Sequence, residues 1–120
     1  MAHRKMNRKN IELELYGIHA EMCKVFSHPK RLELINILRE NECSVGELAG
    51  KLEIAVGNLS QHLTMMKQRQ MLIARKEGNN IYYRLANPKL LKAFDFIREI
   101  LLEQMEHHGE LLRRTRKLAR

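Results

Sequence analysis

The sequence has 120 residues with no tryptophan, two prolines and two cysteines. No apolar run approaches the roughly 18–20 residues of a membrane span. Its length suits a single domain. Cys23 and Cys43 are too few for a disulfide framework. The N-terminus is basic but has no apolar stretch behind it, so we expect no signal peptide. Together these absences predict a cytoplasmic protein.

Between its ends the chain carries almost no net charge, although it is basic overall. The net charge is +8, with 22 Lys and Arg against 14 Asp and Glu. Four basic residues lie in 1–10 and five in 111–120, which leaves −1 for residues 11–110. We therefore predict a basic N-terminal arm (1–10), a folded domain (11–110) and a basic C-terminal tail (111–120). Such ends suit a polyanionic partner, and solvated, frayed ends are the alternative.

Apolar residues recur every three or four positions in the first third of the chain, which is typical of amphipathic helices. One such pattern runs from Ile11 to Val25. Pro29 then suits the first position of a second helix, where its missing N–H is not needed. The apolar pattern of this second helix continues to residues 39–41.

The next two helices are shorter and follow one another closely. Ser44 and Glu47 form a capping box at the start of a helix of about nine residues. Residues 56–69 form the next helix, which follows after a brief connection. Two short helices joined by a tight turn predict a helix-turn-helix. The apolar face of the second is Val56, Leu59, Leu63 and Met66.

The apolar period then changes from 3.6 to 2, which indicates strands. Residues 73–77 and 81–85 flank Gly78-Asn79-Asn80, so we predict a β-hairpin over 73–86 with a polar tip. Asn87-Pro88 ends it and begins a long last helix, whose apolar stripe runs from Leu90 to Met105. The first and last helices carry more apolar surface than one small core requires. That excess predicts a homodimer joined through these two helices.

The helix over 56–69 has an outward face rich in amides and hydroxyls, and no acidic residue occurs from 54 to 76. Amides and hydroxyls suit base edges in a major groove, whereas carboxylates there would repel phosphates. Basic residues of the hairpin are suited to phosphates. The predicted DNA-binding residues are Gly57, Asn58, Ser60, Gln61, His62, Thr64, Lys67, Arg75, Lys76, Asn79 and Asn80.

Four motifs at these spacings resemble the ArsR/SmtB family of winged-helix repressors. They are residues 26–32 (FSHPKRL), 44–49 (SVGELA), 59–63 (LSQHL), and 75–78 (RKEG) with 82–85 (YYRL). The resemblance implies a mainly α fold with a small β-hairpin, a winged helix-turn-helix in the order of four helices, hairpin and helix. It also implies a homodimer on a two-fold symmetric operator, released by a metal, metalloid or oxidant. Ala55-Val56 departs from the Ser-Gln that the family often has before this helix.

The family's sensing sites match this sequence poorly. Its cysteine-pair site would fall on Ser44 and Gly46, neither of which is a cysteine. Of its zinc site on the last helix only Asp95 and His108 match, because Ile97 and Leu111 replace the other ligands. His107 is a further candidate ligand. His19 and Cys23, one turn apart on the first helix, are another candidate metal pair, or packing residues. Cys23 with Cys43 is a candidate thiol-based redox switch, and no effector at all is the remaining alternative.

Other classes of function fit less well. An enzyme needs a converging set of catalytic groups, and the histidines are scattered with no phosphate-binding glycine loop, so we predict no enzymatic activity. A winged-helix module for protein interaction or DNA architecture is the serious alternative, because fold does not determine function. Such a module should expose apolar anchors on the helix over 56–69, and Met65 is the single apolar residue on its outward face.

Overall fold

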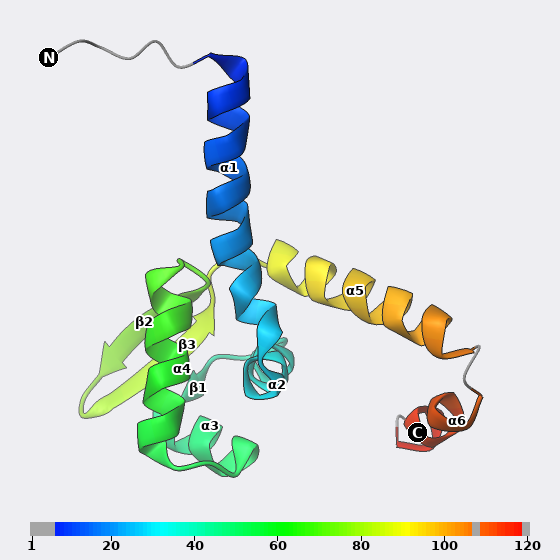
Figure 1. Cartoon of the computed structure of the whole chain (residues 1–120). Helices are drawn as coiled ribbons and strands as arrows, with labels where there is room; N and C mark the ends of the chain where they lie inside the picture. The colour runs from blue at the N-terminus through cyan, green and yellow to red at the C-terminus, as the bar shows by residue number, and fades with distance from the viewer. Residues whose placement is uncertain (1–6, 107–108, 119–120) are drawn as a thin grey trace, which may run out of the picture. The chain divides into compact units, whose positions relative to one another are not determined.

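The computed structural model describes residues 7–106 and 109–118, and within 110–112 it describes the backbone (Figure 1). The chain divides into two compact units, 1–86 and 87–120. No helix among the described residues is long and apolar enough to cross a membrane. The first unit contains α1 (Arg8–Cys23), the 3-10 helix η1 (Lys24–Ser27), α2 (Pro29–Ile37), β1 (Cys43–Ser44), α3 (Val45–Leu52), α4 (Val56–Gln68), β2 (Leu72–Glu77) and β3 (Asn80–Leu85). The second contains α5 (Lys89–Met105) and α6 (Glu110–Leu118).

Side-chain caps begin three of the helices. The Asn7 side chain accepts a hydrogen bond from the backbone N–H of Asn10 at the start of α1. The His28 ring accepts one from the N–H of Lys30, and Pro29 follows as the first residue of α2. The predicted capping box of Ser44 and Glu47 is formed at α3. Each cap satisfies a backbone donor that the helix itself leaves without a partner.

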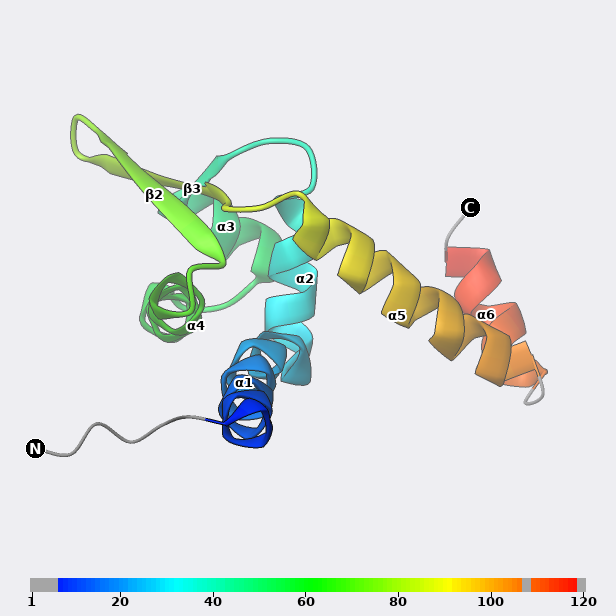
Figure 2. The same ribbon diagram turned by 90° about the horizontal axis from the view of Figure 1, so that it is seen from above.

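The hairpin belongs to an antiparallel sheet of three strands in the order β1-β3-β2. β2 pairs with β3 from Leu72↔Leu85 to Glu77↔Asn80, and Gly78 takes a positive φ in the turn. β1 adds Cys43↔Tyr83 at the other edge of β3. The sequence did not predict β1, because a two-residue strand shows no alternation. Figure 2 shows the β2–β3 hairpin extending away from the helices of its unit.

The core of the first unit is apolar and draws on every helix except α1. Among the described residues no polar or charged one is buried. The predicted core face of α4 is correct for Leu59, Leu63 and Met66 and wrong for Val56, which is 53 % exposed. Val56 is the first residue of α4 and lies at the edge of the core. The largest fully buried side chains are Leu34, Ile35, Leu48, Leu52, Leu59, Met66 and Val25.

Helix α1 has no buried residue and extends away from the rest of the first unit (Figure 1). Its apolar stripe of Ile11, Leu15, Ile18 and Met22 is therefore exposed. In the second unit Leu90 and Phe94 of α5 are buried, whereas Ile97, Ile100 and Leu101 are more than half exposed. These are the two helices whose apolar surface exceeds what one small core requires.

The segment expected as a basic tail, 111–120, contains all of the helix α6 except its first residue, Glu110. Arg116 Nη2 lies 3.6 Å from a carboxylate oxygen of Glu106, and the neighbouring Arg113, Arg114 and Lys117 are exposed. Residues 1–6 of the predicted arm and 119–120 of the tail lie outside the described residues, as do His107 and His108.

Candidate nucleic-acid interface

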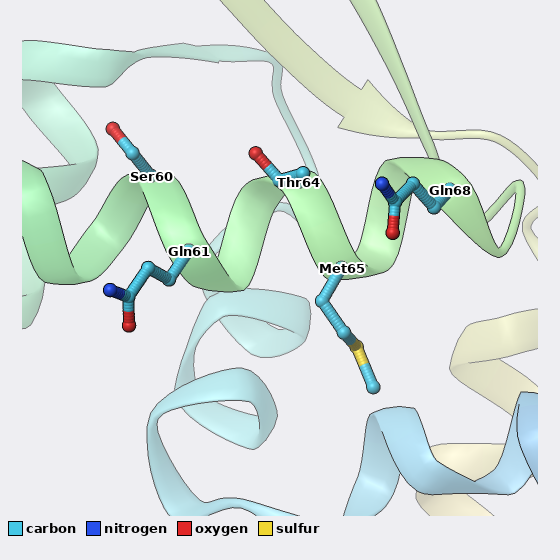
Figure 3. Close-up of a pocket in the computed structure, with 5 residues that line it drawn as sticks. All are labelled: Ser60, Gln61, Thr64, Met65 and Gln68. Carbon is cyan, nitrogen blue, oxygen red and sulfur yellow. The ribbon is translucent and has the colours of Figure 1, made fainter.

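The outward face of α4 is open and carries polar side chains around Met65. Figure 3 shows Ser60, Gln61, Thr64, Met65 and Gln68 along this helix, where they line a shallow depression of about 360 Å³. Ser60, Gln61, Thr64 and Gln68 are exposed, and so are Gly57 and Asn58 one turn earlier. Ala55 gives the helix no side-chain cap, and the first turn holds no acidic residue. The N-terminal amides of α4 therefore face solvent without a competing carboxylate.

A second depression, of about 390 Å³, joins α4 to the hairpin. Ser60 and Thr64 line it from α4, and Asn79 and Asn80 line it from the tip of the hairpin. The fold thus brings together four of the predicted DNA-binding residues from two separate segments. The other lining residues are Val45, Gly46, Leu63, Ile81 and Tyr83.

His62 lies on a different side of α4, against α2. Its ring centroid is 4.5 Å from that of His28, and its Nδ1 is 3.4 Å from Nη1 of Arg31. Burial, then the charges of His28 and Arg31, lower the pKa of His62. Arginine has no acceptor, so Nδ1 accepts the hydrogen bond and the ring proton lies on Nε2. His62 is half-buried and does not share the open face with Gln61.

Arg75 is held by carboxylates. Its guanidinium pairs with Glu42, just before β1, and with Glu77 on its own strand, and it lies 4.8 Å from the ring centroid of Tyr82. The hydrogen bond from Arg75 lowers the pKa of Glu42, and Glu42 and then Glu77 raise the pKa of Arg75. No acidic residue occurs from 54 to 76 in the sequence, but folding brings Glu42 next to Arg75 of this stretch.

Three other basic residues lie on this surface, and the charge of one of them, Arg84, also lowers the pKa of Glu42. Lys67 of α4 and Lys76 and Arg84 of the hairpin are all exposed. Arg69, in contrast, pairs with Glu21 at 3.0 Å. The basic charge available to a phosphate backbone is therefore concentrated on fewer side chains than the sequence suggests.

The candidate sensing residues are dispersed. Among the residues that the structure describes, no three His, Cys, Asp or Glu side chains lie together as metal ligands would. His19 and Cys23 are exposed on α1, and Asp95 is half-buried on α5. Cys23 and Cys43 are both free thiols, and Cys43 is buried with its Sγ 3.9 Å from Nζ of Lys51.

Three residues that organise this surface were not predicted from the sequence, namely Arg31, Arg69 and Glu42. Arg31 entered only as part of a family motif and Arg69 only as a positive charge. Their partners lie 31, 48 and 33 residues away in the chain. No local pattern connects residues at such distances.

This chain is similar in sequence to known bacterial regulators. The model of the arsR family of bacterial regulatory proteins matches residues 28–71. The HTH-type transcriptional regulator Rv0081 of Mycobacterium tuberculosis is 33% identical over 88 residues, which are 72% of this chain and 77% of that protein. The biofilm growth-associated repressor of Agrobacterium fabrum is 35% identical over 88 residues, which are 73% of this chain and 75% of that repressor.

Solved structures show the same fold. The crystal structure of Rv0081 superposes with a TM-score of 0.72 at 30% identity, over 78% of this chain and 95% of that one. A domain from Mycobacterium bovis is described as a homodimeric winged helix-turn-helix DNA-binding domain. It superposes with a TM-score of 0.75 at 26% identity, over 92% of this chain and 98% of that domain. The predicted winged helix-turn-helix is thereby confirmed. This chain belongs to the ArsR family of bacterial regulatory proteins.

Proposed function

We propose that the protein is a homodimeric repressor that binds double-stranded DNA in a sequence-specific manner, with α4 in the major groove and the hairpin 73–86 as its wing. The observation that carries this proposal is the depression shared by α4 and the hairpin, which Ser60 and Thr64 line together with Asn79 and Asn80. Its lining includes hydroxyls and amides and no carboxylate. Such groups suit the donors and acceptors of DNA.

Sequence reading is assigned to the exposed face of α4. The Gln61 amide is exposed there, and an amide can donate to and accept from the edge of one adenine. The same exposed face continues about one turn before Gln61 to Asn58 and about one turn after it to Thr64, with Ser60 next to Gln61. Lys67, Lys76 and Arg84 supply exposed positive charge for phosphates, which positions the protein without reading sequence.

Dimerisation is assigned to α1 and α5. Each bears large apolar side chains that are about half exposed in the single chain, Ile18 at 59 % and Leu101 at 52 % among them. Apolar surface of this extent usually marks an interface. The Mycobacterium bovis relative is described as homodimeric. Two copies related by a two-fold axis would read an inverted repeat.

An inducing signal is a further part of this proposal. A metal, metalloid or redox signal would act through the residues that the sequence offers, with His19 and Cys23 as candidate ligands on α1 and Cys23 and Cys43 as candidate thiols. The cytoplasm, where the bacterial chromosome lies, is the compartment in which this function operates.

The test is selection of duplexes from a random-sequence pool by the wild-type protein, followed by affinity measurements on selected and random DNA. We expect an inverted repeat to emerge. Gln61→Ala should weaken binding to the selected duplex by about 1–3 kcal/mol and relax its sequence preference. Asn36→Ala, at an exposed amide of α2 outside the surfaces assigned to DNA and to dimerisation, is the matched control and should change neither.

Two results would count against the proposal. Equal losses on selected and random DNA for Gln61→Ala would remove the base-reading role. A pool that yields no preferred sequence would favour the rival function, a winged-helix module for protein interaction or DNA architecture.

A further inference from the structure

Arg69, just after α4, is bonded to the C-terminal half of α1. Its Nε donates to the backbone carbonyl of Glu21 at 3.0 Å and its Nη2 to the Glu21 carboxylate at 3.0 Å. Its Nη1 donates to the carbonyl of Met65, inside α4, at 3.3 Å. One guanidinium thus holds the last turn of α4 against α1.

Arg31 of α2 makes a similar set of bonds at the middle of α4. Its Nη2 donates to the carbonyl of Lys24 at 2.8 Å and to the hydroxyl of Ser27 at 3.2 Å, and its Nε to the carbonyl of Val25 at 3.2 Å. Its Nη1 approaches Nδ1 of His62 on α4. The guanidinium therefore connects η1, which continues α1, to the helix proposed to read DNA.

We propose that Arg31 and Arg69 are positioning residues, an arginine clamp that sets α4 against α1 and η1 and so makes sequence reading depend on the N-terminal helix. This inference rests on the proposed function of α4. The clamp consists of directional bonds to backbone carbonyls, which only a fork of several N–H donors can make at once. A lysine would keep the charge and lose the geometry.

The clamp connects the end of the exposed apolar stripe of α1 to α4 through hydrogen bonds. Glu21 lies next to Met22, the last residue of that stripe, and the Lys24 and Val25 carbonyls follow within one turn. Anything that covers or shifts this end of α1 acts on both arginines. The middle and the last turn of α4, where the two arginines are bonded, would then move with it, because hydrogen bonds of this kind tolerate little change in distance or angle.

An alternative role for Arg69 is direct contact with phosphates, and the two roles predict opposite results. Glu21→Ala would free Arg69 and tighten DNA binding if Arg69 contacts phosphates. If Arg69 is part of the clamp, Glu21→Ala should weaken binding to the selected duplex. Arg69→Lys should be nearly neutral in the phosphate role, since lysine also binds phosphate, and harmful in the clamp role.

The experiment measures affinity for a duplex selected by the wild type and for random duplex, over a range of salt. We expect Arg31→Lys, Arg69→Lys and Glu21→Ala each to lose about tenfold on the selected duplex, the factor that corresponds to one or two hydrogen bonds. Affinity for random duplex and the salt slope should stay unchanged. Glu12→Ala, at an exposed glutamate of α1, is the control. Tighter binding by Glu21→Ala, or equal losses on both duplexes, would overturn the clamp.

Hydrogen exchange of the free protein gives a second readout that needs no DNA. Both arginine-to-lysine variants should exchange the amides of α4 faster than the wild type while those around Leu34 and Ile35 in α2 stay protected. Unchanged exchange in α4 would refute the clamp whatever the DNA result. Faster exchange in α4 together with a pool that selects no sequence would instead refute the proposed function and leave the clamp standing.

Discussion

Nη1 of Arg31 lies 3.4 Å from Nδ1 of His62, across 31 residues of sequence. This contact places a permanent positive charge beside a ring that can also become charged. Burial is the largest cause that lowers the pKa of His62, followed by the charges of His28 and Arg31. Burial and these charges therefore favour the neutral ring of His62, whose Nδ1 can accept a hydrogen bond from Arg31, and a proton on Nδ1 would break that bond.

The stability of the protein should depend on pH through His62. In the unfolded chain His62 titrates near its ordinary pKa of about 6.5, above its pKa in the folded protein. Between the two values the unfolded state binds more protons, so the free energy of unfolding falls as pH falls through this window. We expect His62→Gln to remove that fall. Urea titrations at several pH values measure the free energy of unfolding, and His19→Gln on α1 is the control. If the free energy of unfolding changes with pH in the same way for His62→Gln and the wild type, the prediction is wrong.

Glu42→Gln should strengthen binding to any DNA. The Glu42 carboxylate pairs with Arg75 and keeps that charge from phosphates. Glu42→Gln leaves Arg75 paired with Glu77 alone, so its charge becomes more available and the slope of log K against log salt should steepen, by at most about 0.9, the value for one phosphate contact. Glu40→Gln, an exposed glutamate a few residues earlier, should change little. Weaker binding by Glu42→Gln would instead mean that the pair with Arg75 holds the wing in its binding shape.

Two leucines of α1 offer a matched test of dimerisation. Leu15 and Leu13 are 59 % and 58 % exposed and lie on opposite sides of α1. Leu15 belongs to the apolar stripe of Ile11, Ile18 and Met22. We expect Leu15→Asp to dissociate the dimer in sedimentation experiments and to lose DNA affinity, whereas Leu13→Asp should keep both. Dissociation by both variants alike would show that the stripe does not define the interface.

Leu34 is the test of the core. It is fully buried in α2, and its truncation leaves a cavity in the first unit. We expect Leu34→Ala to lower the free energy of unfolding by about 2–5 kcal/mol. Leu118→Ala, at a side chain that is 88 % exposed in α6, should stay within about 0.5 kcal/mol of the wild type. Chemical denaturation of both variants measures the difference; similar values would refute the assigned core.

The sequence by itself determined the order of the main elements. Apolar periodicity, Pro29 and the Ser44–Glu47 capping box located the helices, and Asn79-Asn80 after Gly78 located the turn of the hairpin. These signals succeed because each depends on residues a few positions apart, within one turn of helix or one hairpin. The polar outward face of α4 followed from the same periodicity, since an apolar side fixed toward the core leaves the other side to solvent.

Tertiary structure alone decided which charges are available and which side chains cooperate. Arg75 was predicted to bind DNA and Arg69 was only one of the basic residues, yet folding pairs both of them with carboxylates, Glu42 and Glu21. β1 exists only because β3 offers it a partner edge. Val56 fitted the apolar face of α4 and is exposed, because a periodic pattern does not show where the core ends. A long side chain pairs with residues that folding brings close to it. Because these residues are distant in the sequence, no local pattern predicts the pair.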